Sequence, residues 1–259
     1  MKSKTLCFGS VIIICLFTNF YSQNVFAQGP GLLPDMQTVV PLHLQIQNQQ
    51  QHEYLRFSNG IANTGVGDLR LRPEFPIGDI TQPQLAIQEI LDANGNIVSE
   101  TVVSQFQYHP AHKHWHITGT ALFEVRMGSP TGAVFGTNSV KTTFCLIDWY
   151  TLSGNANTKA RTYFDCFGDH QGISPGWVDQ YHQELDGQAL DITGAPAGLY
   201  YLVSKANPDN NFIESDNSNN VAWVAFMLFR KSGGNASIEI VGHSDCNSTG
   251  LCGDDAPNR

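Results

Sequence analysis

Short segments rich in β-branched and aromatic residues, separated by Gly, Pro, Asn and Asp, most constrain the fold of this chain. Three of them are ALFEVRM (121–127), GLYYLVSKANP (198–208) and NVAWVAFMLFR (220–230). Residues 53–75 predict a strand, a Gly/Asn turn and a second strand, and Ala-Asn-Gly-Asn at 93–96 is a hairpin turn signal between two apolar arms. We therefore predict an all-β fold with an antiparallel Ig-like β-sandwich core and long irregular loops, of which residues 151–176 form one.

The first residues have the pattern of a secretory leader. Lys2 and Lys4 precede an apolar run over residues 11–20, and the small side chains of Val25 and Ala27 stand at the cleavage positions. The run is shorter than the about 20 residues that span a bilayer. We predict a signal peptide over 1–27 and a secreted or periplasmic protein, with an uncleaved anchor as the alternative. Residues 28–259 would form a single domain, with a core over about 32–230 and a peripheral tail over 231–259.

The charge balance argues against one class of partner. The 259 residues carry 14 basic and 23 acidic side chains, a formal charge of −9. The leader holds two lysines and no acid, so the rest of the chain carries 12 − 23 = −11. Nucleic-acid binding needs a basic footprint and is not expected, whereas an acidic protein suits a cationic substrate. We expect no membrane span after cleavage, and the sequence leaves the oligomeric state open.

Cysteine usage indicates an oxidising compartment. Two of the six cysteines lie in the leader, and an even number remains: Cys145, Cys166, Cys246 and Cys252. In an exported chain this suggests two disulfides. Order along the chain favours Cys145–Cys166 and Cys246–Cys252, but four cysteines allow three pairings. Their spacing is not that of a zinc ribbon.

Four of the nine histidines are crowded into the stretch YHPAHKHWH (108–116). Alternate residues of a strand share a face, so we expect His112, His114 and His116 to point together, with Trp115 on the other side. Three imidazoles in this arrangement can hold copper, zinc, iron or nickel, and copper leads the affinity order. His109 is out of phase with them and is expected beside the site rather than as an equivalent ligand. A surface histidine stripe or a hydrogen-bonded core cluster is the alternative.

At these residues the sequence resembles the lysyl oxidase family. YHPAHKHWH is similar to the family's copper motif WHSCHQHYH. The likeness continues in order through LLPDM (32–36), KTTFCLID (141–148), CFGDHQGISPGWVDQYHQELDGQALDIT (166–193) and PAGLYYLVSKANPDNNFIESDNSNNV (196–221). It covers about residues 32–230, and the long loops would then carry the site.

The resemblance implies a copper-dependent amine oxidase with a cofactor made from its own side chains. In this cofactor, lysine tyrosylquinone, the lysine falls on Lys141 and the tyrosine on Tyr181. Primary amines, either peptidyl lysine or small amines, would be oxidised to aldehydes by molecular oxygen, with release of hydrogen peroxide and ammonia. Asp179 would share a strand face with Tyr181 and is our candidate general base. The alternatives are a solvated lysine, a core tyrosine and a structural aspartate.

The resemblance also implies a calcium site. Carboxylate and amide oxygens are dense in ESDNSNN (214–220), and calcium prefers six to eight oxygen ligands. The implied ligands are Glu214, Asp216, Asn219 and Asn220, completed by Asp35 and the backbone of Met36. An acidic, Asn-rich turn is the alternative.

One departure from the family concerns a cysteine. Ala111 stands where the family's copper motif has one, so Cys166 must pair elsewhere or stay free, and Cys145 is the obvious substitute. Two other functions stay open at this point. One is a non-catalytic, calcium-stabilised Ig-like adhesion module whose histidines only sequester metal. The other is a zinc hydrolase that uses the three histidines and a water molecule.

Overall fold

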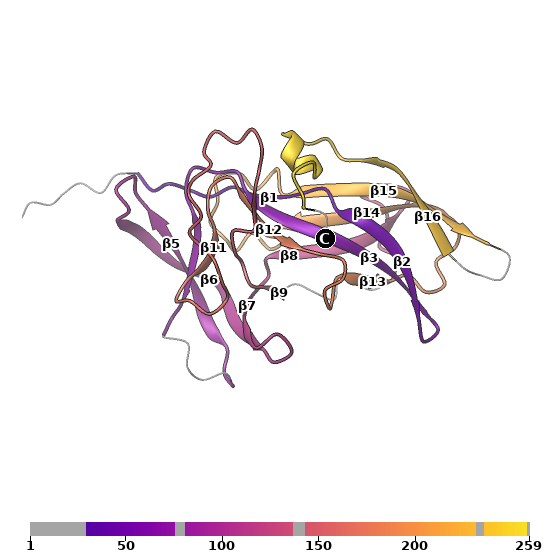
Figure 1. Ribbon diagram of the computed structural model, residues 1–259, viewed down its shortest axis with the longest axis horizontal. Coiled ribbons are helices and arrows are strands. Elements are labelled where there is room, and N and C mark those ends of the chain that lie inside the picture. Colours follow the sequence, from indigo (N-terminus) through magenta and orange to yellow (C-terminus); the bar gives the residue numbers. More distant parts are fainter. Residues whose placement is uncertain (1–29, 76–80, 137–142, 232–235, 258–259) are drawn as a thin grey trace, which may run out of the picture.

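The computed structural model describes residues 30–75, 81–136, 143–231 and 236–257, and in them the fold is all-β (Figure 1). Every pairing between its strands is antiparallel, and the single helical element in these residues is a short 3-10 turn, η1 (Thr249–Cys252). The prediction of an antiparallel all-β protein is confirmed. Among the described residues no helix has the length and apolar character needed to cross a membrane.

The strands form three sheets. The first is ordered β1-β3-β12-β10, with β2 and β13 also paired to β3: β1 (Met36–Thr38), β2 (Leu42–Gln49), β3 (His52–Asn63), β10 (Tyr150–Thr151), β12 (Trp177–Tyr181) and β13 (Ala189–Asp191). The second is ordered β11-β4-β5-β6-β7-β9: β4 (Leu69–Pro73), β5 (Gln84–Leu91), β6 (Ile97–His109), β7 (His114–Thr118), β9 (Thr143–Phe144) and β11 (Gln171–Ile173). The third is ordered β16-β15-β14-β8: β8 (Ala121–Met127), β14 (Gly198–Ala206), β15 (Val221–Arg230) and β16 (Ala236–His243).

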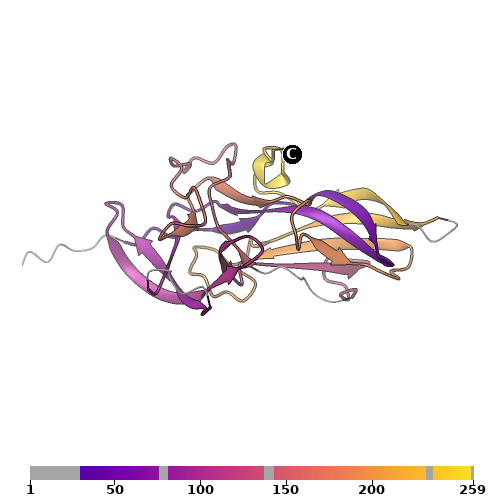
Figure 2. The same cartoon turned by 60° about the horizontal axis from the view of Figure 1, so that its bottom comes forward.

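The first and third sheets pack face to face, and the second extends from one end of this pair (Figures 1 and 2). Phe57 of β3 and Phe123 of β8 lie between the packed sheets, with ring centroids 4.9 Å apart. Both are about 1% exposed, as is Phe226 of β15. Burial of each such ring contributes roughly 1.5–3 kcal/mol. A buried hydrogen bond of 2.7 Å between the hydroxyls of Thr38 and Ser204 joins the same two layers.

The predicted hairpin turn is confirmed between β5 and β6. The carboxylate of Asp92 accepts hydrogen bonds from the backbone N–H groups of Asn94 and Asn96, at 2.8 and 2.9 Å. Gly95 has a φ of +83°, in the region that side chains other than glycine rarely adopt. The turn therefore fixes the register of the two longest strands of the second sheet.

The three apolar segments that most constrained the fold are β8, β14 and β15, and they are neighbours in the third sheet. Residues 152–170 contain no strand, but the loop predicted over 151–176 is wrong at its ends, because Thr151 belongs to β10 and Gln171–Ile173 form β11. The segment after residue 235 is packed more closely than we expected. β16 pairs with β15 along most of its length, and Leu251 beyond it is 5% exposed.

Candidate active site

The four crowded histidines lie at one end of the hairpin that joins β6 to β7. β6 ends at His109 and β7 begins at His114, and these two residues face each other in the ladder. The turn closes because the carbonyl of His109 accepts hydrogen bonds from the N–H groups of His112 and Lys113. Lys113 has a φ of +58°. Our prediction that His112 shares a strand with His114 and His116 is wrong, because His112 approaches them from this turn.

The three predicted ligands nevertheless converge. Their ring nitrogens include one set that lies within 4.8 Å of one another. Nε2 of His114 is 2.9 Å from Nε2 of His116, and Nδ1 of His112 is 3.3 Å from the same atom. Ligand nitrogens about 2 Å from a shared ion have similar separations, so the residues fit a transition metal. His116 is 1% exposed, and its Nδ1 contacts the Thr143 hydroxyl at 3.3 Å, which orients the ring.

His109 packs against this trio without joining it. Its ring is stacked on that of His116 with a centroid distance of 4.8 Å, and lies 4.2 Å from the ring of His112. Nδ1 of His109 is buried and has no hydrogen-bond partner among the described residues. His109 therefore lies beside the three convergent histidines, where it limits the movement of the rings of His112 and His116.

Tyr181 and Asp179 lie on β12, two residues apart and on one face of the strand. Asp179 is 3% exposed. The hydroxyl of Tyr181 donates to the carbonyl of Cys145 at 2.9 Å and accepts from the Cys145 N–H at 2.7 Å. Burial raises the pKa of this phenol well above its ordinary value, and the nearby charge of Asp179 raises the pKa further. At neutral pH the tyrosine is therefore protonated and held at both sides of its oxygen.

Both predicted disulfides are present. Cys145–Cys166 and Cys246–Cys252 have Cα–Cα distances of 5.7 and 5.5 Å, within the usual range. The first attaches the loop before β11 to the segment that holds the Tyr181 hydroxyl. The predicted cofactor lysine, Lys141, lies outside the described residues.

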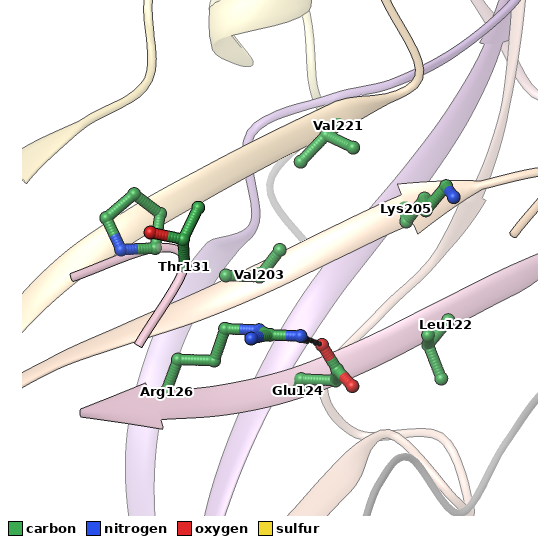
Figure 3. A pocket seen from close by; sticks show the side chains of 8 residues that line it. Leu122, Glu124, Arg126, Thr131, Val203, Lys205 and Val221 are labelled. Carbon is green, nitrogen blue, oxygen red and sulfur yellow. Dashed lines mark hydrogen bonds and ion pairs between the residues drawn. The ribbon is translucent and has the colours of Figure 1, made fainter. Parts of the chain in front are cut away.

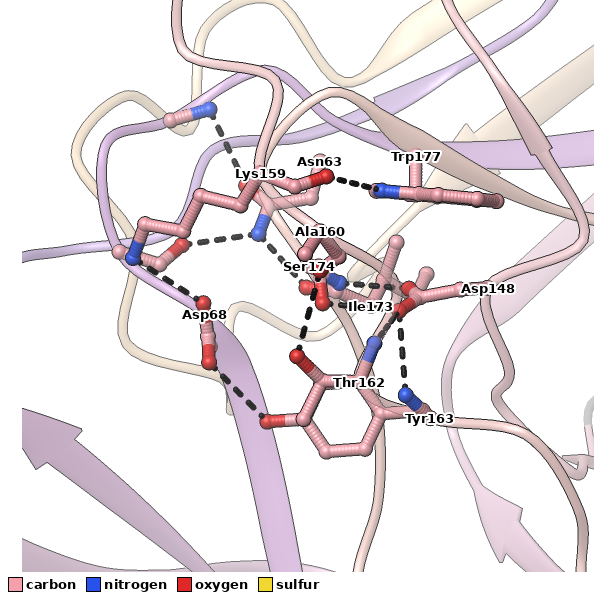
Figure 4. Close-up of polar contacts among 12 residues, drawn as sticks. Asn63, Asp68, Asp148, Lys159, Ala160, Thr162, Tyr163, Ile173, Ser174 and Trp177 are labelled. Carbon is pink, nitrogen blue, oxygen red and sulfur yellow. Dashed lines mark hydrogen bonds and ion pairs between the residues drawn. The ribbon is translucent and has the colours of Figure 1, made fainter.

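Asp148 supports the same region, and the sequence did not single it out as a structural residue. Its buried carboxylate accepts hydrogen bonds from the N–H groups of Thr162, Tyr163 and Ser174 and from the Ser174 hydroxyl, at 2.7–3.1 Å (Figure 4). These bonds tie the long loop to the segment before β12. The loop therefore has a fixed path beside the site although it contains no strand.

Two of the three convergent histidines, His112 and His114, line a cleft of about 370 Å³ together with Tyr181 and Asp179. It is open on one side and is bounded by side chains from β12, the loop after it and the disulfide. Its lining residues are His112, His114, Cys145, Ile147, Trp149, Cys166, Asp179, Gln180, Tyr181 and Leu185. The cleft thus joins candidate metal ligands from the second sheet to a tyrosine and a carboxylate from the first.

A second cavity, of about 330 Å³, lies on the third sheet (Figure 3). Arg126 lines it and donates to the carboxylate of Glu124 at 2.8 Å, and Val203 and Val221 are also among its lining residues. No histidine or cysteine lines it. The cleft with the histidines is therefore the better candidate for redox chemistry.

The residues implied as calcium ligands come together from two distant parts of the chain. Glu214 accepts a hydrogen bond from the N–H of Met36 at 2.7 Å, and Asn219 donates to Asp35 at 3.1 Å. The side-chain carbonyl oxygens of Asn219 and Asn220 are buried without a hydrogen-bond partner in the described part of the chain. Such oxygens suit a hard cation.

Asp216 lies at the exposed edge of this group. Its carboxylate accepts hydrogen bonds from the N–H and the hydroxyl of Ser218, at 2.7 and 2.6 Å. These bonds lower the pKa of Asp216. The other implied ligands are joined by direct contacts, whereas the hydrogen bonds of Asp216 stay within its own turn.

Fold and site together define an all-β protein with three convergent imidazoles beside a partly buried tyrosine and a buried carboxylate. The sequence profile described as Lysyl oxidase matches residues 88–233, more than half of the chain. This chain therefore belongs to the lysyl oxidase family.

Individual relatives match a shorter region. The chain is 33% identical over 116 residues to human lysyl oxidase homolog 1, covering 45% of this chain and 19% of that protein. It is 32% identical over 117 residues to pig protein-lysine 6-oxidase, covering 45% and 44%. To chicken lysyl oxidase homolog 2 it is 33% identical over 119 residues, covering 44% and 14%. The matched region spans less than half the length of each of these relatives.

Proposed function

We propose that this chain is a copper-dependent amine oxidase that converts primary amines to aldehydes and reduces oxygen to hydrogen peroxide, with release of ammonia. One observation carries the proposal. In a chain of the lysyl oxidase family, three imidazoles converge, and two of them, His112 and His114, line a cleft together with a partly buried tyrosine and a buried carboxylate. One relative is itself named protein-lysine 6-oxidase, which supports lysine side chains as substrates.

His112, His114 and His116 would hold the copper ion. Their nitrogen separations of 2.9 and 3.3 Å suit a common ion, and copper has the highest affinity for imidazole sites among the divalent first-row metals. The contact of Thr143 with His116 and the stacking of His109 on the same ring would keep the ligands oriented.

Lys141 and Tyr181 would supply the quinone. When formed, lysine tyrosylquinone offers a carbonyl group that condenses with the amine and accepts its electrons. Before that, one hydrogen bond from the Cys145 N–H and one to the Cys145 carbonyl fix the oxygen of Tyr181. Phe144 packs edge-on against the ring with a centroid distance of 4.5 Å. These contacts hold the tyrosine in one orientation within the cleft.

Asp179 would accept the proton from the carbon next to the amine nitrogen. It shares a strand face with Tyr181 and lines the same cleft, and both observations support this role. Because Asp179 is only 3% exposed to solvent, a proton transfer to its carboxylate would be shielded from bulk water. Its negative charge also attracts the ammonium form of the substrate.

The deciding experiment combines a peroxide assay with peptide mass spectrometry. Protein expressed with copper and oxygen should release peroxide only when an amine is present, and the peptides carrying Lys141 and Tyr181 should be covalently linked. Tyr181→Phe should abolish both signals. Tyr150→Phe is the matched control, because Tyr150 carries a buried hydroxyl on β10, the strand that pairs with β12.

Other results would favour the alternatives. A zinc hydrolase would be indicated if the protein held stoichiometric zinc and released no peroxide, and if the Tyr181→Phe variant kept unchanged hydrolysis. Copper-loaded protein with unlinked peptides and no amine turnover would contradict the proposed oxidase and favour a binding module.

We also propose a structural calcium ion at Asp35, Met36, Glu214, Asp216, Asn219 and Asn220. The buried, unpartnered carbonyl oxygens of Asn219 and Asn220 support it, as does the approach of Glu214 to β1. The ion would attach the beginning of the described chain to the turn before β15. Calcium titration followed by thermal unfolding tests this, with magnesium as the control cation.

We also propose that the protein is exported to the periplasm or outside the cell. Both disulfides of the described chain would persist in the periplasm or outside the cell. Amino-terminal sequencing of the exported protein should begin at Gln28.

A further inference from the structure

Part of the lining of the cleft is apolar and takes no part in the proposed reaction. We call this part the apolar wall. Apart from the histidines, Gln180, Tyr181 and Asp179, the cleft is lined by Ile147, Trp149, Leu185 and the Cys145–Cys166 disulfide. These groups are apolar and carry no charge. Asp179 is the one carboxylate among the lining residues. An amine in this cleft therefore meets one buried negative charge, the polar groups of the histidines, Gln180 and Tyr181, and a surface of hydrocarbon and sulfur.

Large apolar side chains remain exposed at the opening of the cleft. Trp149 is 39% exposed and Leu185 36%. Phe167, next to the disulfide, is 74% exposed, and its ring meets that of His114 edge-on with a centroid distance of 5.9 Å. Exposed apolar groups that gather around a cleft indicate a binding surface, whereas single ones scattered over a surface do not.

The backbone holds these side chains in place. The carboxylate of Asp165 accepts hydrogen bonds from the N–H groups of Phe167 and Gly168, at 2.8 and 2.9 Å. Cys166, which lies between Asp165 and Phe167, is fixed by its disulfide. The N–H of Trp149 donates to Val178 of β12 at 2.9 Å. Phe167 is therefore presented to solvent by a turn with its own hydrogen bonds, and does not fold onto the core.

We propose that Trp149, Leu185 and Phe167 form a subsite for the carbon stem of the substrate, an inference that rests on the proposed function. The ammonium lies toward Asp179, and the methylene groups or ring of the same molecule cover the apolar wall. The favoured substrate class is a primary amine on an unbranched apolar stem of at least four carbons, or on an aromatic ring. A lysine side chain meets this description, whereas methylamine leaves the wall exposed.

The first test uses a series of unbranched alkylamines from propylamine to hexylamine with the copper-loaded enzyme. A fully buried methylene would raise kcat/KM about fourfold, and half burial in an open cleft about twofold. From propylamine to hexylamine we therefore expect a rise of about eightfold, expressed mainly in KM. Phe167→Ser and Trp149→Ser should each reduce this ratio to about threefold.

Phe75→Ser is the matched control, because Phe75 is 60% exposed and lines a different cavity. It should keep the eightfold ratio. A ratio near one in the unaltered enzyme, or an equal loss in the Phe75 variant, would overturn the subsite. Absence of peroxide with every amine would instead overturn the proposed function, and the inference would fall with it.

The second test does not depend on turnover. Hexylamine binding to protein prepared without copper should change the intrinsic fluorescence, because Trp149 is on the apolar wall. Trp149→Phe should remove the change, whereas Trp223→Phe, on the third sheet, should retain it. Affinity that does not increase from propylamine to hexylamine, or a signal that survives in Trp149→Phe, would contradict the proposal.

Discussion

The Cys145–Cys166 disulfide offers the sharpest test of how this site is held together. We consider the double variant Cys145→Ala/Cys166→Ala, with Cys246→Ala/Cys252→Ala as the matched control. The first bond joins residues 21 positions apart and the second joins residues six apart. In the chain-entropy description, removal of a disulfide destabilises a protein because the unfolded chain gains freedom, and the gain increases with loop length.

The two loop lengths give different magnitudes. A loop of 21 residues corresponds to about 3 kcal/mol at 25 °C, and a loop of six residues to about 2 kcal/mol. For a domain of this size each kcal/mol lowers Tm by about 2–4 °C. We expect the first variant to melt about 6–12 °C below the unaltered protein, and the control about 4–8 °C below it.

Local effects should separate the variants more clearly than stability does. The backbone of Cys145 makes both hydrogen bonds to the Tyr181 hydroxyl, so loss of the first disulfide should loosen that contact. Amide hydrogen exchange at residue 145 should accelerate in the first variant and stay slow in the control, under conditions where both are folded. Equal exchange rates in the two variants would refute the view that the disulfide fixes the tyrosine.

Three further predictions concern other parts of the molecule. His114→Ala should lower copper content, measured by elemental analysis, at least tenfold, while His243→Ala should leave it unchanged. Burial opposes ionisation of Glu89, but hydrogen bonds from Arg70 and the positive charges around the carboxylate lower its pKa below 4.5. The ionised Glu89 therefore stabilises the fold above pH 4.5, and this stabilisation is lost as the pH falls further. Glu89→Gln should therefore cost about 3 kcal/mol near pH 7 and reduce the acid dependence of Tm below pH 4.5. Removal of calcium with a chelator should lower the Tm of the unaltered protein and have little effect on Glu214→Gln, and an equal shift in both would contradict the calcium site.

His170 extends the pH dependence to a second window. Burial lowers its pKa below 6.5, and the charge of Arg70 lowers it further. The unfolded chain therefore binds more protons than the folded chain just below pH 6.5, and stability falls as the pH decreases through this range. His170→Gln should flatten Tm between pH 6.5 and 5. A fall in Tm over this range that persists in the variant would show that another group is responsible.

Local sequence patterns predicted the elements of the fold better than their arrangement. The turn at Asp92–Asn96 was recognisable because its determinants, an aspartate and a glycine, lie within five residues. By contrast, the two halves of β3 pair with different strands. The first half pairs with β2 and β13, and the second half pairs with β1 and β12. This arrangement depends on pairings between segments more than 100 residues apart, and no periodicity in β3 indicates it.

The same distinction applies to the site. The histidines could be found because they lie within eight residues, although the turn at Lys113 that brings in His112 was not foreseen. The pairing of Tyr181 with the Cys145 backbone joins positions 36 apart through main-chain atoms, which carry no residue-specific signal. Phe167 could not be recognised either, because its importance comes from its exposure beside His114 rather than from its neighbours in sequence.

The histidines are joined by contacts within one hairpin, whereas Tyr181 is held by contacts between distant segments. We therefore expect these two parts of the site to form independently. The proposed metal ligands belong to one hairpin, so their convergence requires only β6, β7 and the turn between them. The orientation of Tyr181 requires β12 in the first sheet, the segment around Cys145 and the disulfide to Cys166. Copper content should therefore survive the Cys145→Ala/Cys166→Ala substitution, whereas the covalent link between the Lys141 and Tyr181 peptides should be lost. Loss of both together would show that the metal site depends on the same long-range contacts as the tyrosine.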